Sequence, residues 1–158
     1  MNGGAVDDAT RLVTIDDIRA AARVLAGVAL HTPLVPFGAS GRRQWLKAES
    51  LQPIGAFKLR GAYHAAAVLP ADERARGLIT YSSGNHAQGV ARAARLFGVP
   101  AVIVMPSDAP PLKKARVEAD GAEVVVVGTA SDERRRVAVM AASAGRVDVP
   151  AEASSRRW

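Results

Sequence analysis

Hydrophobic residues recur at helical spacing near the start of the chain. Thr14 can cap a helix because its hydroxyl is placed to accept a hydrogen bond from the first turn, and Asp16 and Asp17 suit that turn. Gly27 is expected to end this helix. Its apolar face would consist of Ile15, Ile18, Ala22 and Leu25.

The next segments change between extended and helical patterns. Pro33 and Pro36 favour an extended piece, which a loop connects to a short strand at residues 44–47. A helix is predicted over residues 56–69, where Pro70 closes it. This part of the chain contains no internal repeat.

From Gly77 onward the pattern becomes regular. Strand-like runs at residues 78–81, 101–105 and 123–127 start about 22 residues apart and alternate with helix-like segments. That spacing is typical of successive βαβ units, whose right-handed crossovers build a parallel sheet covered by helices. The sequence therefore predicts an α/β fold, an open parallel sheet with helices on both faces.

Two crossover helices would connect these strands, and a third would follow the last of them. The first has the clearest pattern and is expected to end at Gly98. The second spans about residues 110–119 and the third residues 131–144. The apolar stripe of the first helix consists of Ala87, Val90, Ala91, Ala94 and Phe97.

The charge balance narrows the class of partner. The net charge is +6, from 21 basic and 15 acidic residues. This permits nucleic-acid binding, but only Arg134, Arg135 and Arg136 run together, as on a solvated helix face, and aromatic residues make up only 4%. We therefore expect no nucleic-acid partner.

Composition excludes further classes. With no cysteine, the chain can form no disulfide, thiolate metal site or cysteine nucleophile. No apolar run approaches the ~20 residues that cross a bilayer. Residues 1–10 carry Asp7 and Asp8 without the apolar core of a signal peptide. These features predict a cytoplasmic globular protein with no membrane partner.

Two glycine-punctuated stretches carry candidate chemistry. The first contains Gly55, Phe57, Lys58 and Arg60, at the start of the helix predicted over residues 56–69. Gly55 allows a tight backbone approach, a neutral lysine amine can bond a carbonyl cofactor, and Phe57 can cover a flat ring. From these residues alone, the alternative is a surface lysine beside Arg60.

The second stretch covers residues 81–89, between a predicted strand and the following helix. Ligands of open α/β sheets collect at that edge. Backbone N–H groups around Ser83 and Gly84 can hold an anion such as a carboxylate, and Asn85 can donate to a phenolate-like oxygen. The alternative is an ordinary serine cap with a glycine turn. His86 has no second ligand at i+4, so we interpret it as structural or supporting and set metal binding aside.

Together the two stretches resemble one family closely. A Gly-Ala-Phe-Lys-Leu-Arg-Gly-Ala segment around Lys58 is followed, 24 residues after the lysine, by Ser-Ser-Gly-Asn-His-Ala-Gln-Gly from Ser82. Both are similar to motifs of the serine/threonine dehydratase (ammonia-lyase) branch of fold type II pyridoxal-phosphate enzymes, a tryptophan synthase β-like fold that also contains serine racemase. Cysteine synthases of this fold usually show Ser-Val-Lys-Asp-Arg and Gly-Asn-Thr-Gly instead. The resemblance runs from about Ile15 to Val127.

The resemblance implies roles for the motif residues. Lys58 would carry the cofactor, pyridoxal 5'-phosphate, through its amine, Phe57 would pack on the pyridine ring, and Asn85 would bond the ring hydroxyl oxygen. Ser83 would lie on the face opposite Lys58, where racemases of this family use a serine. The loop that grips the substrate carboxylate would consist of Ser82, Ser83, Gly84, Asn85 and His86.

The implied reaction is deamination of L-threonine or L-serine to a 2-oxo acid and ammonia. Lys58 would remove the α-proton before the β-hydroxyl leaves. Serine racemase and hydroxyaspartate ammonia-lyase remain alternatives, because the loop grips only the carboxylate that all these substrates share. The resemblance implies a small amino-acid substrate and a homo-oligomeric parent enzyme.

The chain also departs from the family pattern. Family members are much longer, and this sequence contains no glycine-rich tetrad of the kind that holds the cofactor phosphate. We therefore expect a truncated N-terminal fragment, with a catalytically silent fragment as the alternative from a different class. Residues 1–73 would be the incomplete part of the larger cofactor-binding domain, residues 74–150 a small α/β domain, and residues 151–158 an atypical tail.

Overall fold

The structure, a computed structural model, describes residues 12–38, 43–143 and 145–150. The predicted tail at residues 151–158 lies outside the described residues. No helix in the described ranges is long and apolar enough to cross a bilayer. The elements, in chain order, are α1 (Ile15–Val24), β1 (Leu34–Phe37), β2 (Gln44–Lys47), the 3-10 helix η2 (Glu49–Leu51), α2 (Lys58–Ala67), α3 (Ala71–Ala75), β3 (Leu78–Tyr81), α4 (Asn85–Phe97), β4 (Ala101–Pro106), α5 (Pro111–Ala119), β5 (Glu123–Val127), α6 (Ser131–Ser143) and β6 (Val147–Asp148).

A parallel sheet with the strand order β5-β4-β3-β6 forms the centre of the fold. Leu78 of β3 pairs with Ala101 of β4, and Val102 of β4 pairs with Glu123 of β5. The predicted parallel sheet is therefore confirmed. The sequence did not indicate β6, which pairs with β3 on its other side, because two residues are too few to show a periodic pattern.

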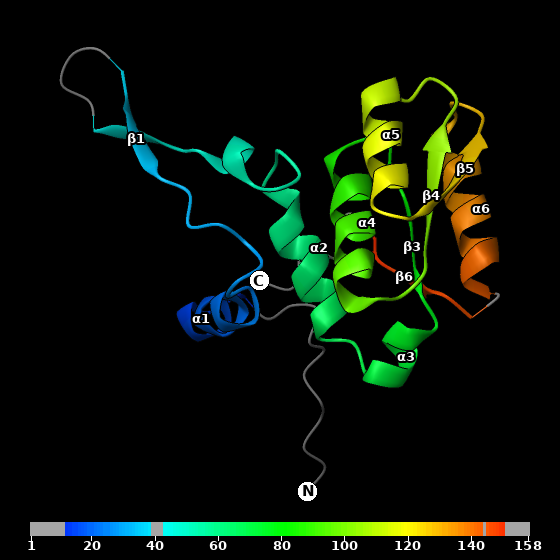
Figure 1. Cartoon of the computed structure of the whole chain (residues 1–158), viewed down its shortest axis with the longest axis horizontal. Helices are drawn as coiled ribbons and strands as arrows, with labels where there is room; N and C mark the ends of the chain where they lie inside the picture. Colours follow the sequence, from blue (N-terminus) through cyan, green and yellow to red (C-terminus); the bar gives the residue numbers. More distant parts are fainter. Residues whose placement is uncertain (1–11, 39–42, 144, 151–158) are drawn as a thin grey trace, which may run out of the picture.

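Helices cover both faces of this sheet, as predicted. In Figure 1, α4 and α5 lie on one face, α6 lies on the other, and α2 packs on the outer side of α4. Alternate strand residues supply the two cores: Leu78 and Ile103 are fully buried toward α4, while Ile79 and Val104 are fully buried toward α6. This alternation is the period-2 geometry of a strand buried on both faces.

The apolar stripe predicted for the first crossover helix is found in α4. Val90 and Ala91 are fully buried, and the ring of Phe97 stacks on Tyr63 of α2 with ring centroids 4.7 Å apart. Gly98 ends the helix in the left-handed conformation, with φ of 67°. A glycine adopts this conformation without the steric cost that a Cβ brings.

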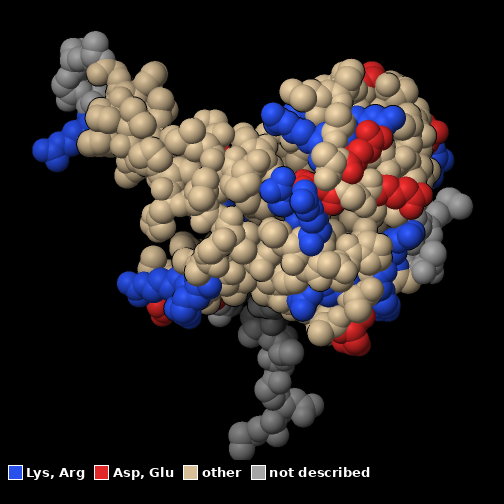
Figure 2. Space-filling view, in the orientation of Figure 1, with Lys and Arg blue, Asp and Glu red and all other residues tan. Residues whose placement is uncertain are grey.

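The N-terminal arm, which carries the β1–β2 pair, extends away from the parallel sheet (Figure 1). β1 and β2 form an antiparallel pair, and Figure 2 shows that the surface of this arm is mostly uncharged. In α1 the predicted apolar face is only partly buried: Leu25 is covered, Ile15 and Ile18 are about half exposed, and the buried alanine is Ala21 rather than Ala22. The large apolar side chains exposed on the hairpin are Leu34, Val35, Phe37, Trp45 and Leu46.

Candidate active site

Lys58 is the first residue of α2. The predicted helix over residues 56–69 therefore begins two residues later than expected, because a turn occupies the preceding positions. Gly55 has φ of 73°, in the left-handed region, and its N–H donates to the carbonyl of Gln52 at 2.7 Å. The Lys58 Nζ lies 5.4 Å from the centroid of the Phe57 ring, which is about half exposed. The turn thus places an amine and an aromatic face together at the helix start.

Glu49 connects this turn, through hydrogen bonds, to Arg60 of α2 and to Thr32 of the N-terminal arm. Arg60 donates to both carboxylate oxygens of Glu49, at 2.8 and 2.9 Å, and the Thr32 hydroxyl donates at 2.6 Å. The hydrogen bond from Arg60 lowers the pKa of Glu49 from its ordinary 4.5 to about 2, with smaller contributions from Thr32 and Gln52 in the same direction. Burial opposes this shift. The segment leading to Lys58 is therefore anchored by charge-assisted hydrogen bonds.

The second motif forms the loop between β3 and α4. The Ser82 N–H continues the ladder by donating to Val104 at 3.0 Å, and the Ser82 hydroxyl accepts from the Gly84 N–H at 3.2 Å. Ser83 is exposed on this loop. Because α4 begins at Asn85, the first N–H groups of the helix have no partner within it and carry its positive dipole end. The loop therefore offers backbone donors to an anion.

The side chain of His86 points into the protein. Its residue is 4% exposed, and Nε2 lies 2.8 Å from the carbonyl oxygen of Val149, which follows β6. The imidazole therefore joins α4 to the edge strand. Its backbone N–H, in the first turn of α4, belongs to the donors that face the loop.

A close helix crossing brings the two motifs together. A Cβ atom on Gly89 would lie 3.0 Å from the Lys58 carbonyl oxygen and 3.0 Å from the Ala62 Cβ. Gly89 follows Asn85 by one helical turn, so the start of α2 lies against the first turns of α4. The crossing therefore brings the backbone of Lys58 close to the helix that follows the loop at residues 82–86, although the two motifs are separate in sequence.

Lys113 contacts Asn85, a contact that the motifs did not indicate. It lies in the first turn of α5, and its Nζ donates a hydrogen bond to Asn85 Oδ1. Gln88 Nε2 approaches the same oxygen at 3.4 Å. The position of α5 after β4 is the available sequence signal, because the carboxyl ends of neighbouring parallel strands share one edge of the sheet.

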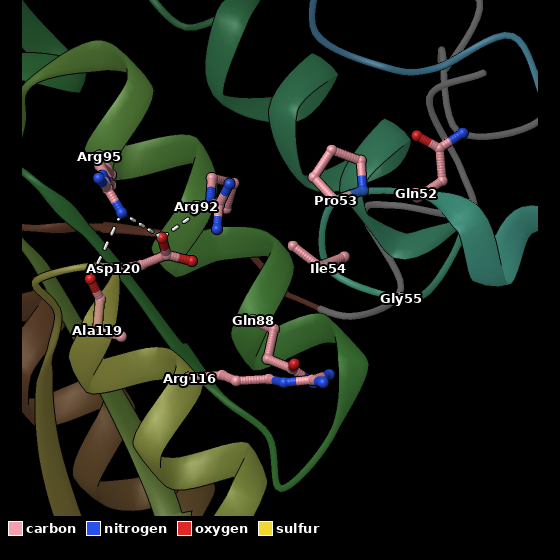
Figure 3. A pocket seen from close by; sticks show the side chains of 10 residues that line it. All are labelled: Gln52, Pro53, Ile54, Gly55, Gln88, Arg92, Arg95, Arg116, Ala119 and Asp120. Carbon is pink, nitrogen blue, oxygen red and sulfur yellow. Dashed lines mark hydrogen bonds and ion pairs between the residues drawn. The ribbon is translucent and has the colours of Figure 1, made fainter.

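A pocket of about 390 Å³ is lined in part by residues 52–55, the turn before Lys58 (Figure 3). The carboxylate of Asp120, 5% exposed, accepts from Arg92 at 2.8 Å and from Arg95 at 3.1 Å. The Gln88 Oε1 is buried and has no partner among the described residues. This pocket includes neither Lys58 nor Ser83. Its lining residues are Gln52, Pro53, Ile54, Gly55, Gln88, Arg92, Arg95, Arg116, Ala119 and Asp120.

The donor set at Lys58 fits a ring-shaped aldehyde cofactor and a substrate carboxylate. Lys58 supplies an amine, Phe57 an aromatic face, and Asn85 an amide whose Nδ2 has no hydrogen-bond partner among the described residues. A Cβ on Gly84 would meet no atom within 4 Å, so space is open beside the loop. The residues present therefore suit the ring and aldehyde of pyridoxal phosphate.

Comparison with known proteins shows the family of the chain. The family model described as "Pyridoxal-phosphate dependent enzyme" matches residues 25–156. An L-threonine ammonia-lyase of Thermotoga maritima is 44% identical over 132 residues, which cover 81% of this chain and 33% of the relative. An L-threo-3-hydroxyaspartate ammonia-lyase of Pseudomonas is 40% identical over 131 residues, 80% of this chain and 41% of the relative.

A solved structure agrees with these sequences. The structure of maize serine racemase superposes with a TM-score of 0.80 at 34% identity, over 85% of this chain and 43% of that protein. The chain thus spans less than half the length of the relatives it matches.

Proposed function

Because the chain belongs to the family of pyridoxal-phosphate-dependent enzymes, in its threonine dehydratase and serine racemase-like branch, we propose that it supplies the catalytic lysine and the carboxylate loop of an L-threonine or L-serine ammonia-lyase. One observation carries this proposal. The contact between Gly89 and Lys58 holds the start of α2 against the first turns of α4, which supports the proposal that the Lys58 amine and the loop at residues 82–86 would serve one site.

Three residues would hold the cofactor. The Lys58 amine would bond its aldehyde carbon, Phe57 would lie along its ring, and Asn85 Nδ2 would donate to its ring oxygen. Pyridoxal phosphate, when bound, supplies an electron sink for negative charge at the substrate α-carbon. The rest of the reaction depends on positions that the protein fixes.

The loop at residues 82–86 would hold the substrate. Its backbone N–H groups and the positive end of α4 attract the α-carboxylate. This contact would orient the Cα–H bond toward Lys58. Once the substrate amine has replaced Lys58 on the cofactor's aldehyde carbon, the released Lys58 amine would take the α-proton as a general base. Loss of the β-hydroxyl as water, followed by hydrolysis, gives ammonia and a 2-oxo acid.

A racemase or a hydroxyaspartate ammonia-lyase is the second candidate. The exposed Ser83 favours it, since its hydroxyl, if it lies on the face opposite Lys58 as the family resemblance implies, would return a proton to the other side of the α-carbon. A hydroxyaspartate substrate would present the same α-carboxylate to the same loop.

The test is a chimera in which this chain replaces the matching segment of the Thermotoga maritima L-threonine ammonia-lyase. We expect pyridoxal-phosphate-dependent formation of 2-oxobutyrate from L-threonine, and its loss in Lys58→Ala. D-serine formation from L-serine, or preference for 3-hydroxyaspartate, would favour the second candidate. A folded chimera that binds the cofactor and processes none of these substrates would contradict the proposal.

A further inference from the structure

Lys113 contacts the site from an element that the proposed function does not use. Its Nζ donates to Asn85 Oδ1 between the packed helices α5 and α4. We infer that Lys113 is a positioning residue: it fixes the Asn85 amide with Oδ1 turned toward α5, so that Nδ2 faces the cofactor ring. This inference rests on the proposed function for the identity of the ring.

The local structure holds Lys113 in place. Pro111 is the first residue of α5, where its missing N–H costs nothing, and the Lys113 N–H donates to the Pro110 carbonyl at 2.9 Å. α5 also packs on α4 and on β5. Lys113 is partly buried, so its ammonium approaches Asn85 from a rigid helix start.

The chemistry of the amide makes this contact directional. An ammonium group can only donate, so it selects the oxygen end of an asparagine side chain and leaves the NH₂ end opposite. Gln88, which is 1% exposed, adds a weaker contact to the same oxygen at 3.4 Å. A phenolate-like ring oxygen needs a donor, whereas a flipped amide would present it with an acceptor. Lys113 therefore excludes the unproductive orientation.

Lys114 provides a matched control. It is the next residue of α5, but its Nζ lies 3.9 Å from Glu118 on the surface, with both side chains about half exposed. A substitution there removes one lysine charge from the same helix without touching Asn85. Lys113→Arg is the conservative variant, because a guanidinium is also a donor without an acceptor.

The first measurement uses the 158-residue chain without cofactor. The ¹⁵N relaxation of the Asn85 side-chain amide is compared in the native chain, Lys113→Met, Lys113→Arg and Lys114→Met. We expect the order parameter to fall in Lys113→Met, toward the value below about 0.6 that marks flexible groups, and to stay near native in the other two. A lysine that only ties α5 to α4 would change the midpoint of unfolding while Asn85 stays ordered. An Asn85 amide that remains equally ordered in folded Lys113→Met overturns the inference.

The second measurement titrates the chimera with pyridoxal phosphate and follows visible absorbance. Losing one oriented donor should weaken the apparent affinity of Lys113→Met roughly tenfold, with Lys113→Arg and Lys114→Met close to native. Failure of the native chimera to bind contradicts the proposed function, while the relaxation measurement still decides the role of Lys113. Native affinity in Lys113→Met overturns the inference.

Discussion

The backbone of Lys58 and the α-carbon of Gly89 approach so closely that a Cβ on Gly89 would lie 3.0 Å from the Lys58 carbonyl oxygen. The same Cβ would lie 3.0 Å from Ala62. Backbone and a buried alanine cannot swing aside as a long side chain can. The absence of a side chain at Gly89 is therefore what lets α2 and α4 cross at Lys58.

Replacing Gly89 with alanine should destabilise the chain. Helix propensity alone predicts a gain of about 1 kcal/mol in unfolding free energy for alanine over glycine inside a helix. Overpacking against Lys58 and Ala62 should outweigh this gain, for a net loss of about 1 to 3 kcal/mol. Urea denaturation measures the effect, and Gly89→Val should lose more. A stabilised Gly89→Ala variant would mean that the helices separate at little cost.

The Glu49 carboxylate should make stability depend on pH in the acid range. Its pKa in the folded chain is about 2, below the ordinary 4.5. It therefore stabilises the fold fully above the ordinary value, and this stabilisation is lost as the pH falls toward 2. Glu49→Gln should lower the unfolding free energy by roughly 1 to 2 kcal/mol at neutral pH and flatten its slope between about pH 5 and 2.

The exposed pair of Lys114 and Glu118 supplies the control for this pH dependence. Glu118→Gln should keep the native slope, because a solvent-exposed ion pair contributes little. If Glu49→Gln and Glu118→Gln show the same slope as the native chain, the Arg60 contact does not stabilise the folded state.

Asp120 should be the most sensitive charge around the pocket. It is almost fully buried and accepts from both Arg92 and Arg95. Asp120→Ala leaves two guanidinium groups without their acceptor and should cost roughly 1 to 3 kcal/mol of unfolding free energy. Asp16→Ala, in an exposed pair with Arg19, should cost at most about 1 kcal/mol. Equal losses in thermal denaturation would show that burial of Asp120 adds nothing.

Asn85→Asp should separate stability from cofactor binding. The new carboxylate would keep an acceptor for Lys113, so the unfolding free energy should stay within about 1 kcal/mol of native. It would lose the Nδ2 donor and place a negative charge where the ring oxygen is expected. The apparent affinity of the chimera for pyridoxal phosphate should fall at least about tenfold. Native affinity in this variant would show that Asn85 does not contact the cofactor.

Strong periodic patterns predicted most of the fold. The strands β3 and β5 match their predicted ranges, and the α4 stripe with Gly98 at its end is found as expected. The sequence did not predict the short elements α3 and β6, because they contain too few residues to show a periodic pattern. The face of α1 was predicted from spacing alone, which cannot say what covers it, and Ile15 and Ile18 are about half exposed.

The motifs indicated Lys58 and the loop but not the contacts that join them. Gly89 is one of 14 glycines, and only the close crossing of α2 and α4 explains why a glycine is needed at this position. Lys113 and Lys114 are adjacent in sequence, and helical spacing alone does not tell which of them meets Asn85. Such contacts depend on tertiary packing, which a local pattern does not contain. The domain boundary at residues 73 and 74 and the roles of the site residues stay predictions.

Reduction of the 158-residue chain with borohydride in the presence of pyridoxal phosphate tests most directly whether Lys58 is the amine that bonds the cofactor. The chain has only four lysines, Lys47, Lys58, Lys113 and Lys114, so peptide mass spectrometry can assign the reduced label to each. We expect preferential labelling of Lys58 at low cofactor concentration, with the label lost from that peptide in Lys58→Ala. Equal labelling of all four lysines, or preference for another one, would contradict it.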